Sequence, residues 1–244
     1  MIGAVYQCYK RMKCAEFVLA NYRLHYPDST VVLVSDGGLD FSRVAQKHGC
    51  VYYHEDRLPG PLGADVERPI GMTGSNYYHS PQIIKDYFDR LARCLSHVNE
   101  DYFMILEDDV FVLRGTDRRT LRFDANGYNP HESLPQKVCA ILGKKTLPYG
   151  ACGGSIQSTR LLKEALSDQN RGKLHDLIDQ FCANDPMRTK WAGDALISFV
   201  VYAFGGTIGG YPGFCETWHP DLAERLRKNT IEVLHLYKAL YDLE

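Results

Sequence analysis

Neither basic nor acidic residues are in excess in this chain, which has 28 Lys and Arg against 30 Asp and Glu and a net charge of −2. The phosphate backbone of nucleic acid is therefore not expected as a partner, because binding to it depends on clustered positive charge. No stretch reaches the ~18 to 20 apolar residues that cross a bilayer, which argues against a membrane span. The first residues, MIGAVYQCYKRMK, are too short and too polar for a signal peptide. We expect a soluble protein without a membrane anchor.

Closely spaced cysteine pairs are also missing. None of the eight cysteines forms a CxxC pair, and most lie inside apolar segments, as Cys14 and Cys139 do. This pattern is typical of a reduced protein in which cysteine serves as a small apolar side chain, and it predicts a cytoplasmic location. The even number of cysteines keeps disulfides as an alternative.

Apolar runs and helical patterns alternate over the first half of the chain. Residues 57–80 interrupt them with a Gly- and Pro-rich stretch that has no periodicity, and a loop of this length is usually functional. The order strand, helix, strand, helix, strand, loop, helix, strand predicts an α/β protein with a single Rossmann-like, mostly parallel central sheet flanked by helices. The predicted strands are 2–6, 29–36, 50–56 and 101–115, and the predicted helices are 10–27, 41–49 and 81–98.

The second half of the chain is less regular. QKVCAIL at 136–142 predicts a strand, and the Gly-rich residues 149–159 turn helical at their end. A strongly apolar helix is expected to begin near Asp194, and IEVL at 231–234 has the pattern of a strand. No linker divides the chain, so we expect one domain over residues 1–244.

Three carboxylates, Glu107-Asp108-Asp109, interrupt the apolar run MILEDDVFVL. Ligands of open α/β sheets gather beyond the carboxyl ends of the strands, which is where this triplet lies. In an extended chain Glu107 and Asp109 face one way and Asp108 the other. Two carboxylates on one side can share a divalent cation. The alternative is a solvated turn in a hairpin, with VFVL as its second strand.

In this context LEDDVFV resembles the DxD metal motif of GT-A-fold glycosyltransferases, and the order of elements is similar over roughly residues 2–125. The resemblance implies a hexosyltransferase-type enzyme that uses Mn²⁺ or Mg²⁺ and a nucleotide sugar, most simply a UDP-sugar, with a hydroxyl-bearing acceptor. It implies that residues 1–125 bind the nucleotide sugar and residues 126–244 the acceptor. It also implies that Asp109 ligates the metal, while Glu107 and Asp108 contact the nucleotide and Glu107 also reaches the metal.

Further donor-binding candidates follow the strand ends. Tyr9 and Arg11 come after the first strand, where the base and ribose would lie, and Asp36 ends the second strand. Asn76 lies in the loop before the helix at Pro81, and Arg90 inside that helix could approach the diphosphate. For Tyr9 and Arg11 the ordinary alternative is a charged helix start on the surface. For Asp36 it is a plain Asp-Gly turn, and for Arg90 a solvated helix face.

Two segments of the second half complete the expected site. ACGGS contains Gly153 and Gly154, which would let the backbone approach a donor sugar closely. WAGD resembles the acceptor-side acid motif of many GT-A enzymes, in which Asp194 would act as general base and Trp191 would stack on a sugar. The alternative is that Asp194 only caps its helix.

His219 and His235 are candidate metal ligands, because many GT-A enzymes use a late histidine in this role, often with a basic residue nearby for the diphosphate. His235 with Lys238 fits better, since it follows the run IEVL. An imidazole ligand would favour Mn²⁺ over Mg²⁺.

Other functions remain alternatives. A non-catalytic nucleotide- or glycan-binding domain would use the same features. A sugar nucleotidyltransferase needs a Gly-rich loop after the first strand, and QCYKRMK has no glycine. A phosphatase DxDxT motif is missing, because Val110 and Phe111 follow Asp109. The stereochemistry of transfer stays open; inversion is expected if Asp194 is the base.

Overall fold

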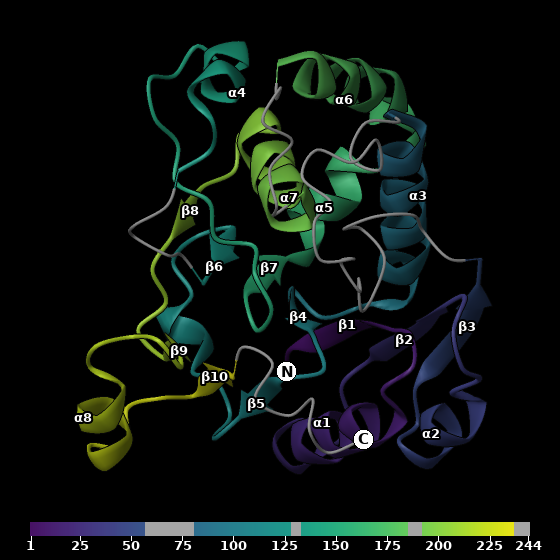
Figure 1. Cartoon of the computed structure of the whole chain (residues 1–244), viewed down its shortest axis with the longest axis vertical. Helices are drawn as coiled ribbons and strands as arrows, with labels where there is room; N and C mark the ends of the chain where they lie inside the picture. The colour runs from purple at the N-terminus through teal and green to yellow at the C-terminus, as the bar shows by residue number, and fades with distance from the viewer. Residues whose placement is uncertain (57–80, 128–132, 185–191, 237–244) are drawn as a thin grey trace, which may run out of the picture.

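Helices cover both faces of a seven-stranded sheet in the computed structural model of the chain (Figure 1). The helices are α1 (Met12–His25), α2 (Ser42–Lys47), α3 (Pro81–His97), α4 (Gln136–Ile141), α5 (Thr159–Ala165), α6 (Arg171–Asn184), α7 (Ala192–Ala203) and α8 (Leu222–Arg227), with short 3-10 turns at Arg118–Thr120 and Asp168–Asn170. The structure describes residues 1–56, 81–127, 133–184 and 192–236.

The large sheet has the strand order β3-β2-β1-β4-β7-β6-β8. The first four of these strands are parallel, β7 is antiparallel to both of its neighbours, and β8 is parallel to β6. The prediction of a mostly parallel central sheet flanked by helices is therefore confirmed. Its strands are β1 (Gly3–Cys8), β2 (Val31–Asp36), β3 (Val51–Glu55), β4 (Tyr102–Leu106), β6 (Ala125–Asn126), β7 (Ile156–Ser158) and β8 (Ile208–Gly209).

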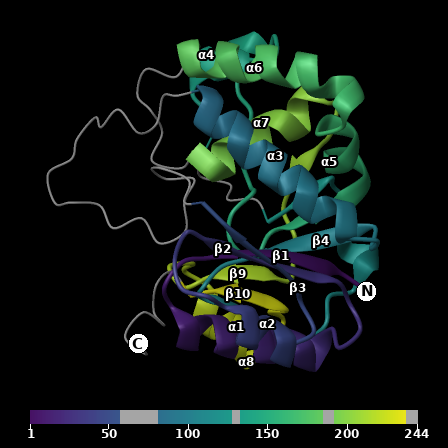
Figure 2. The ribbon, with the colours of Figure 1, turned by 90° about the vertical axis from the view of Figure 1, so that its right-hand side faces the viewer.

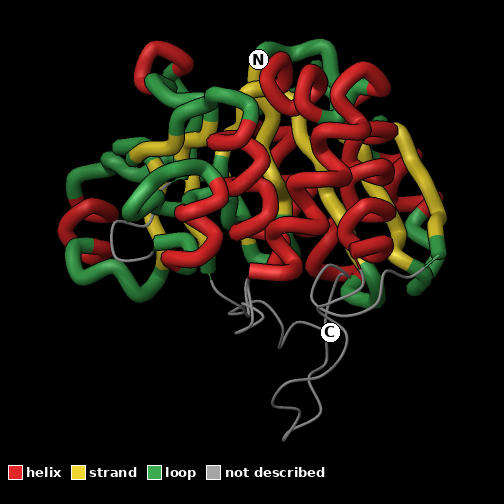
Figure 3. The backbone as a smooth tube through the Cα atoms, turned by 90° about the horizontal axis from the view of Figure 1, so that it is seen from above, coloured by secondary structure: helices red, strands yellow, loops and turns green. Residues whose placement is uncertain are grey.

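A second, three-stranded sheet has the order β5-β10-β9. It lies with α1, α2 and α8 on one side of the large sheet, while α3, α5, α6 and α7 lie on the other side (Figure 2). From above, the strands of the large sheet run side by side beneath the helices (Figure 3). The strands of the small sheet are β5 (Val110–Val112), β9 (Phe214–Glu216) and β10 (Val233–His235).

Every residue of β2 is buried, as its uniform β-branched run predicts. Val31 and Leu33 belong to the core with α1, and Val32 and Val34 belong to the core with α3. On α1 the expected apolar face is confirmed, because its members are fully buried: Ala15, Val18, Leu19 and Tyr22.

The predicted strand at 136–142 is wrong, because residues Gln136–Ile141 form the helix α4. Pro135 precedes the helix, and the amide of Cys139 donates to the Pro135 carbonyl at 2.9 Å. Val138 and Cys139 are the buried positions. Their adjacency, followed by Ile141, suits one face of a helix better than the alternation of a strand.

The Gly-rich segment does not turn directly into a helix. The strand β7 intervenes and pairs with β4 and β6, and the Ser158 side chain at its end accepts from the Leu161 amide to cap α5. A strand of three residues is too short to display a period of two, which explains why the sequence did not predict it.

The hairpin alternative for the acidic triplet is wrong. The strand before it, β4, pairs with β1 and β7, whereas the strand after it, β5, pairs with β10 in the other sheet. The Val110 amide donates to the Glu107 carbonyl at 3.2 Å, so the triplet forms the turn between the two sheets. Because β10 pairs with β5, the end of the described chain comes to lie beside this turn.

All eight cysteines are free, so the disulfide alternative is wrong. Within the described residues, no helix is both long enough and apolar enough to cross a membrane.

Candidate functional site

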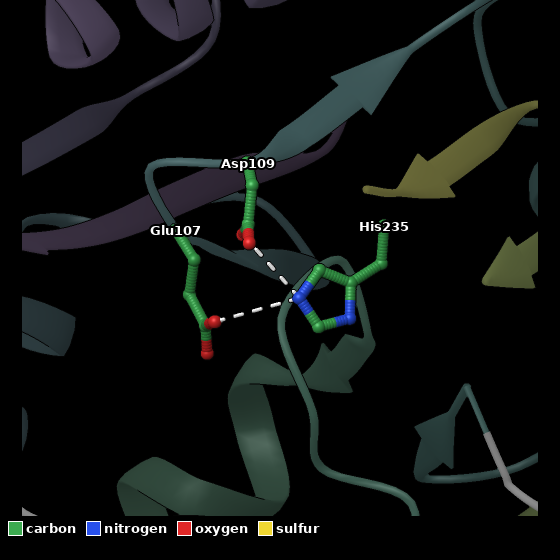
Figure 4. A group of neighbouring side chains, drawn as sticks. All are labelled: Glu107, Asp109 and His235. Carbon is green, nitrogen blue, oxygen red and sulfur yellow. Dashed lines mark ion pairs between the residues drawn. The ribbon is translucent and has the colours of Figure 1, made fainter. Parts of the chain in front are cut away.

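Two acids of the triplet, from the middle of the chain, meet a histidine from near its end (Figure 4). His235 Nε2 lies 3.3 Å from Asp109 Oδ1 and 3.7 Å from Glu107 Oε2. One ligand atom from each of the three side chains lies within 4.8 Å of the other two. The backbone also joins here, because the Leu236 amide donates to the Asp109 carbonyl at 2.8 Å. The turn and β10 thus form one group, which we call the Glu107–Asp109–His235 cluster.

The chemistry of this cluster fits a divalent cation. Asp109 is buried, with its side chain only 3% exposed, and a second carboxylate faces the same point. Burial lowers the pKa of His235, but hydrogen bonds with Asp109 and Glu216 and the charge of Glu107 outweigh it and raise that pKa well above its usual value. A proton on His235 therefore offsets part of the negative charge, and a cation can replace it. Two carboxylates and one imidazole suit Mn²⁺.

Gly153 sets the position of Glu107. A Cβ atom on Gly153 would lie 2.6 Å from Glu107 Cδ, so only glycine lets the carboxylate pack here. Gly154 has a φ of 82°, and its amide donates to the Ile105 carbonyl at 2.7 Å. The structure thus brings both predicted glycines to the cluster; their contact with a donor sugar stays a prediction.

Asp108 points away from the cluster, as predicted, although the triplet forms a turn and not an extended strand. It accepts a hydrogen bond of 2.5 Å from the Tyr6 hydroxyl on β1, and its Oδ2 lies 3.9 Å from Arg11 Nε. Burial raises the pKa of Asp108 to about 7, although the Tyr6 hydrogen bond acts in the opposite direction. Asp108 and Arg11, both predicted to bind the donor, therefore lie together at the end of β1. Sequence reasoning missed Tyr6.

Arg90 and Asp36, also predicted donor residues, contact each other. Arg90 is buried and donates to Asp36 at 2.6 Å, to Glu55 at 3.0 Å and to the Asp56 carbonyl at 2.5 Å. The solvated helix face considered for Arg90 is therefore wrong, and Asp36 is fully buried rather than an open turn. This ion-pair group ties α3 to the carboxyl ends of β2 and β3. Glu55 was missed by sequence reasoning.

Tyr9 lies just beyond β1, where its carbonyl accepts from the Leu39 amide at 2.7 Å. Gly38 packs directly against it, since a Cβ atom there would lie 1.7 Å from that carbonyl oxygen. The loops after β1 and β2 are therefore packed together, which places Tyr9 next to the turn that follows Asp36.

Asp194 lies in the first turn of α7, which begins at Ala192. Burial, and then the charges of Glu216, Asp194 and Glu107, raise the pKa of the Cys152 thiol. Burial has the largest effect on the Tyr87 hydroxyl, and the negative charges of Asp194 and Glu107 add to it, so the pKa of Tyr87 is raised as well. The charges of Asp194 and Glu107 therefore act on the same two side chains.

The remaining predicted residues are not brought to the cluster by the described chain. His219 is described, but its Nδ1 accepts from the Asp221 amide at 3.2 Å, and it is not part of the cluster. Glu216, which sequence reasoning missed, contacts His235 instead. The other three predictions lie outside the described residues: Asn76, Trp191 and Lys238.

No protein-family model matches the sequence, and no curated protein is detectably similar to it. Among solved structures, the chain is similar to the galactosyltransferase LgtC in complex with donor and acceptor sugar analogues, at 13% identity and a TM-score of 0.50, covering 97% of this chain and 87% of that one. An active-site variant of LgtC matches at 14% identity and a TM-score of 0.52, with the same coverage. At such identities the likeness concerns the fold, which is the GT-A fold of glycosyltransferases.

Proposed function

We propose that this protein is a metal-dependent glycosyltransferase that moves a sugar from a nucleotide sugar, most simply a UDP-sugar, to a hydroxyl group on a glycan, protein or lipid. The observation that supports this most is the convergence of Glu107, Asp109 and His235 at the carboxyl end of β4 in a GT-A fold. The carboxyl ends of strands are where ligands bind in open α/β sheets.

On the donor side, Glu107, Asp109 and His235 would hold Mn²⁺ or Mg²⁺, which would supply Lewis-acid stabilisation of the nucleoside diphosphate leaving group. Arg11 and Asp108, which lie together beyond β1, would contact the ribose and base. Arg90 is already engaged by Asp36, so its role would be to fix the strand ends that shape the donor site.

On the acceptor side, Asp194 would be the general base. The acceptor oxygen forms a bond to the anomeric carbon of the sugar, the bond from that carbon to the diphosphate breaks, and the hydroxyl proton passes to Asp194. This direct displacement inverts the configuration. Residues 1–125 would mainly bind the donor and residues 126–244 the acceptor, with His235 as the ligand supplied by the second part.

The test is hydrolysis of a panel of nucleotide sugars with Mn²⁺. Asp109→Asn is expected to lower the rate by about 100-fold or more, because it removes a buried charged ligand. The control is Asp28→Asn, which changes an exposed aspartate after α1. Full activity in EDTA would overturn the metal role, and transfer that survives Asp194→Asn would overturn the base role.

Calorimetry with UDP and Mn²⁺ separates the enzyme from a binding domain. Binding without hydrolysis or transfer from any donor of the panel would overturn the proposal in favour of a non-catalytic nucleotide- or glycan-binding domain.

A further inference from the structure

His235 is contacted on both ring nitrogens. While Nε2 faces Asp109 and Glu107, Nδ1 lies 3.2 Å from Oε1 of Glu216. Glu216 is the last residue of β9 and stands directly opposite His235 in the parallel β9–β10 pair. Both side chains are largely buried, with exposures of 12% for Glu216 and 9% for His235.

The Glu216 contact determines which nitrogen can bind a cation. A neutral imidazole carries one N–H group, and the other nitrogen presents its lone pair. In the metal-free protein carboxylates face both ring nitrogens. A cation that displaces the proton from Nε2 leaves one N–H group, and because the Glu216 carboxylate only accepts hydrogen bonds, it keeps that N–H group on Nδ1. The lone pair is then on Nε2, which is the nitrogen that faces the two acids of the cluster.

We propose that Glu216 is a positioning residue that holds His235 with Nε2 directed at the cation, an inference that rests on the proposed metal-dependent function. Glu216 does not ligate the cation itself. Carboxylates that accept the second N–H group of a ligating histidine fix the orientation of its ring and raise its basicity.

The geometry separates this role from that of a fourth ligand. Nδ1 and Nε2 lie on different edges of the imidazole, so a carboxylate against Nδ1 is directed away from the point that Asp109 and Glu107 share. Glu216 is accordingly not one of the three side chains whose ligand atoms come within 4.8 Å of one another.

The geometry also argues against a purely structural role, in which the Glu216–His235 contact would hold β9 and β10 together. The backbones of β9 and β10 already pair along three residues each, and the Thr217 amide donates to the His235 carbonyl at 3.1 Å. The strand pairing therefore does not need the side-chain contact, which leaves the orientation of the ring as what the Glu216 carboxylate sets at His235.

The first experiment measures the Mn²⁺ dissociation constant of the purified chain by calorimetry. Glu216→Gln keeps the size of the side chain and is expected to weaken binding by about 10- to 100-fold, the range for partners of metal-ligating histidines. The matched control is Glu224→Gln on α8, an exposed glutamate that pairs with Lys228. Thermal unfolding without metal establishes that both variants are folded.

A double-mutant cycle with His235→Asn tests whether Glu216 acts through the ring. If it does, Glu216→Gln causes no further loss of Mn²⁺ affinity once His235 is replaced. A loss of the same size in both backgrounds would overturn the positioning role, because Glu216 would then contact the cation independently of His235.

Imidazole ¹⁵N spectra of the wild-type chain loaded with Cd²⁺ give a readout that needs no variant. We expect the metal on Nε2 and the proton on Nδ1 of His235, and a metal on Nδ1 would overturn the inference. If the Glu216→Gln variant binds Mn²⁺ as tightly as the wild-type chain does, the positioning role is overturned and the metal-dependent function is not. A wild-type chain that binds no Mn²⁺ would overturn both this role and the metal-dependent function.

Discussion

The carboxylate of Glu107 packs against Gly153, a residue without a side chain. Gly153 leaves the space in which that carboxylate packs, since a Cβ atom there would come within 2.6 Å of Glu107 Cδ. Glu107 is also the most open member of the cluster, with 46% of its side chain exposed, so it can turn into solvent when it is displaced. One methyl group at position 153 can therefore change the cluster without unfolding the protein.

Gly153→Ala is expected to weaken Mn²⁺ binding by about 10- to 100-fold, which is the usual effect of disturbing the position of a ligand. The control is Gly172→Ala on α6, where a Cβ atom would meet no other atom within 4 Å. That change should leave the affinity intact and slightly stabilise the helix. Calorimetric titration of both variants checks this, and equal affinities would contradict it.

Metal affinity should depend on pH through His235. Burial lowers its pKa, but Asp109, Glu216 and Glu107 outweigh burial and raise that pKa well above its usual value, so the metal-free ring holds its proton more tightly than a free imidazole does. A cation must displace that proton, so affinity falls by about tenfold for each pH unit below the pKa. Burial raises the pKa of Asp108 to about 7, so its charge is lost over the same range and adds to the fall.

Mn²⁺ titrations from about pH 6 to about pH 8, in buffers of different ionisation enthalpy, count the released protons. His235→Asn should flatten the dependence. An affinity that stays constant across this range would show that His235 does not carry the proton that the cation displaces.

Single residues differ in how much the sequence tells about them. The triplet could be found because its three acids and the flanking apolar runs lie within ten residues. No such signal marks three other residues, because their hydrogen-bond partners are distant along the chain. These residues are Tyr6, Glu55 and Glu216, with partners 102, 35 and 19 residues away. Nothing next to a tyrosine in a strand, or to a glutamate at a strand end, indicates which distant side chain it will contact.

Among the elements, α3 is the helix whose buried arginine ties it to the ends of two strands. Arg90 is buried on its inner face and pairs with Asp36 at the end of β2 and Glu55 at the end of β3. A guanidinium among carboxylates can be buried only while these pairs are kept, because an uncompensated buried charge is strongly unfavourable. The pairs therefore make α3 and the two strand ends depend on one another.

Arg90→Ala is expected to lower the free energy of unfolding by roughly 3–5 kcal/mol, since it leaves buried carboxylate charge without its partner. Arg93→Ala is the matched control, because Arg93 also pairs with Glu55 but is half-exposed, and it should cost less than about 1 kcal/mol. Urea unfolding measures both values. Equal losses would mean that the buried pairs contribute no more than the surface pair.

Whether the sequence predicted a helix or strand depended on the length of that element. The helices α1 and α3 are long enough to repeat their apolar pattern, and both were predicted. The strands β6, β7 and β8 have two or three residues each and show no period. At 136–142 two adjacent apolar residues resembled a buried strand, although their spacing equally fits the short helix α4.

At the scale of the whole molecule, the cluster joins the two sheets. Asp109 lies between β4 of the large sheet and β5 of the small one, and His235 comes from β10, which pairs with β5. Sequence patterns predicted the order of the first elements and the class of the sheet. They did not predict the second sheet, because it joins residues 110–112 from the middle of the chain with residues 214–216 and 233–235 near its end. A cation bound at this junction would therefore stabilise the native arrangement of both sheets.

Mn²⁺ at about 100 times its dissociation constant should stabilise the protein by about 2.7 kcal/mol. For a chain of this size this corresponds to a rise in Tm of about 5 to 10 °C. Thermal unfolding with and without Mn²⁺, reversed by EDTA, measures the shift. Because the cluster lies between the two sheets, near-UV and far-UV signals should move by the same amount.

Asp109→Asn should abolish the Mn²⁺-dependent rise in Tm, while the exposed control Asp28→Asn should keep it in full. The same rise in both variants would place the bound cation elsewhere in the protein. A rise seen in only one of the two spectral signals would show that the cation stabilises a local segment, because a site between the sheets must affect their unfolding together.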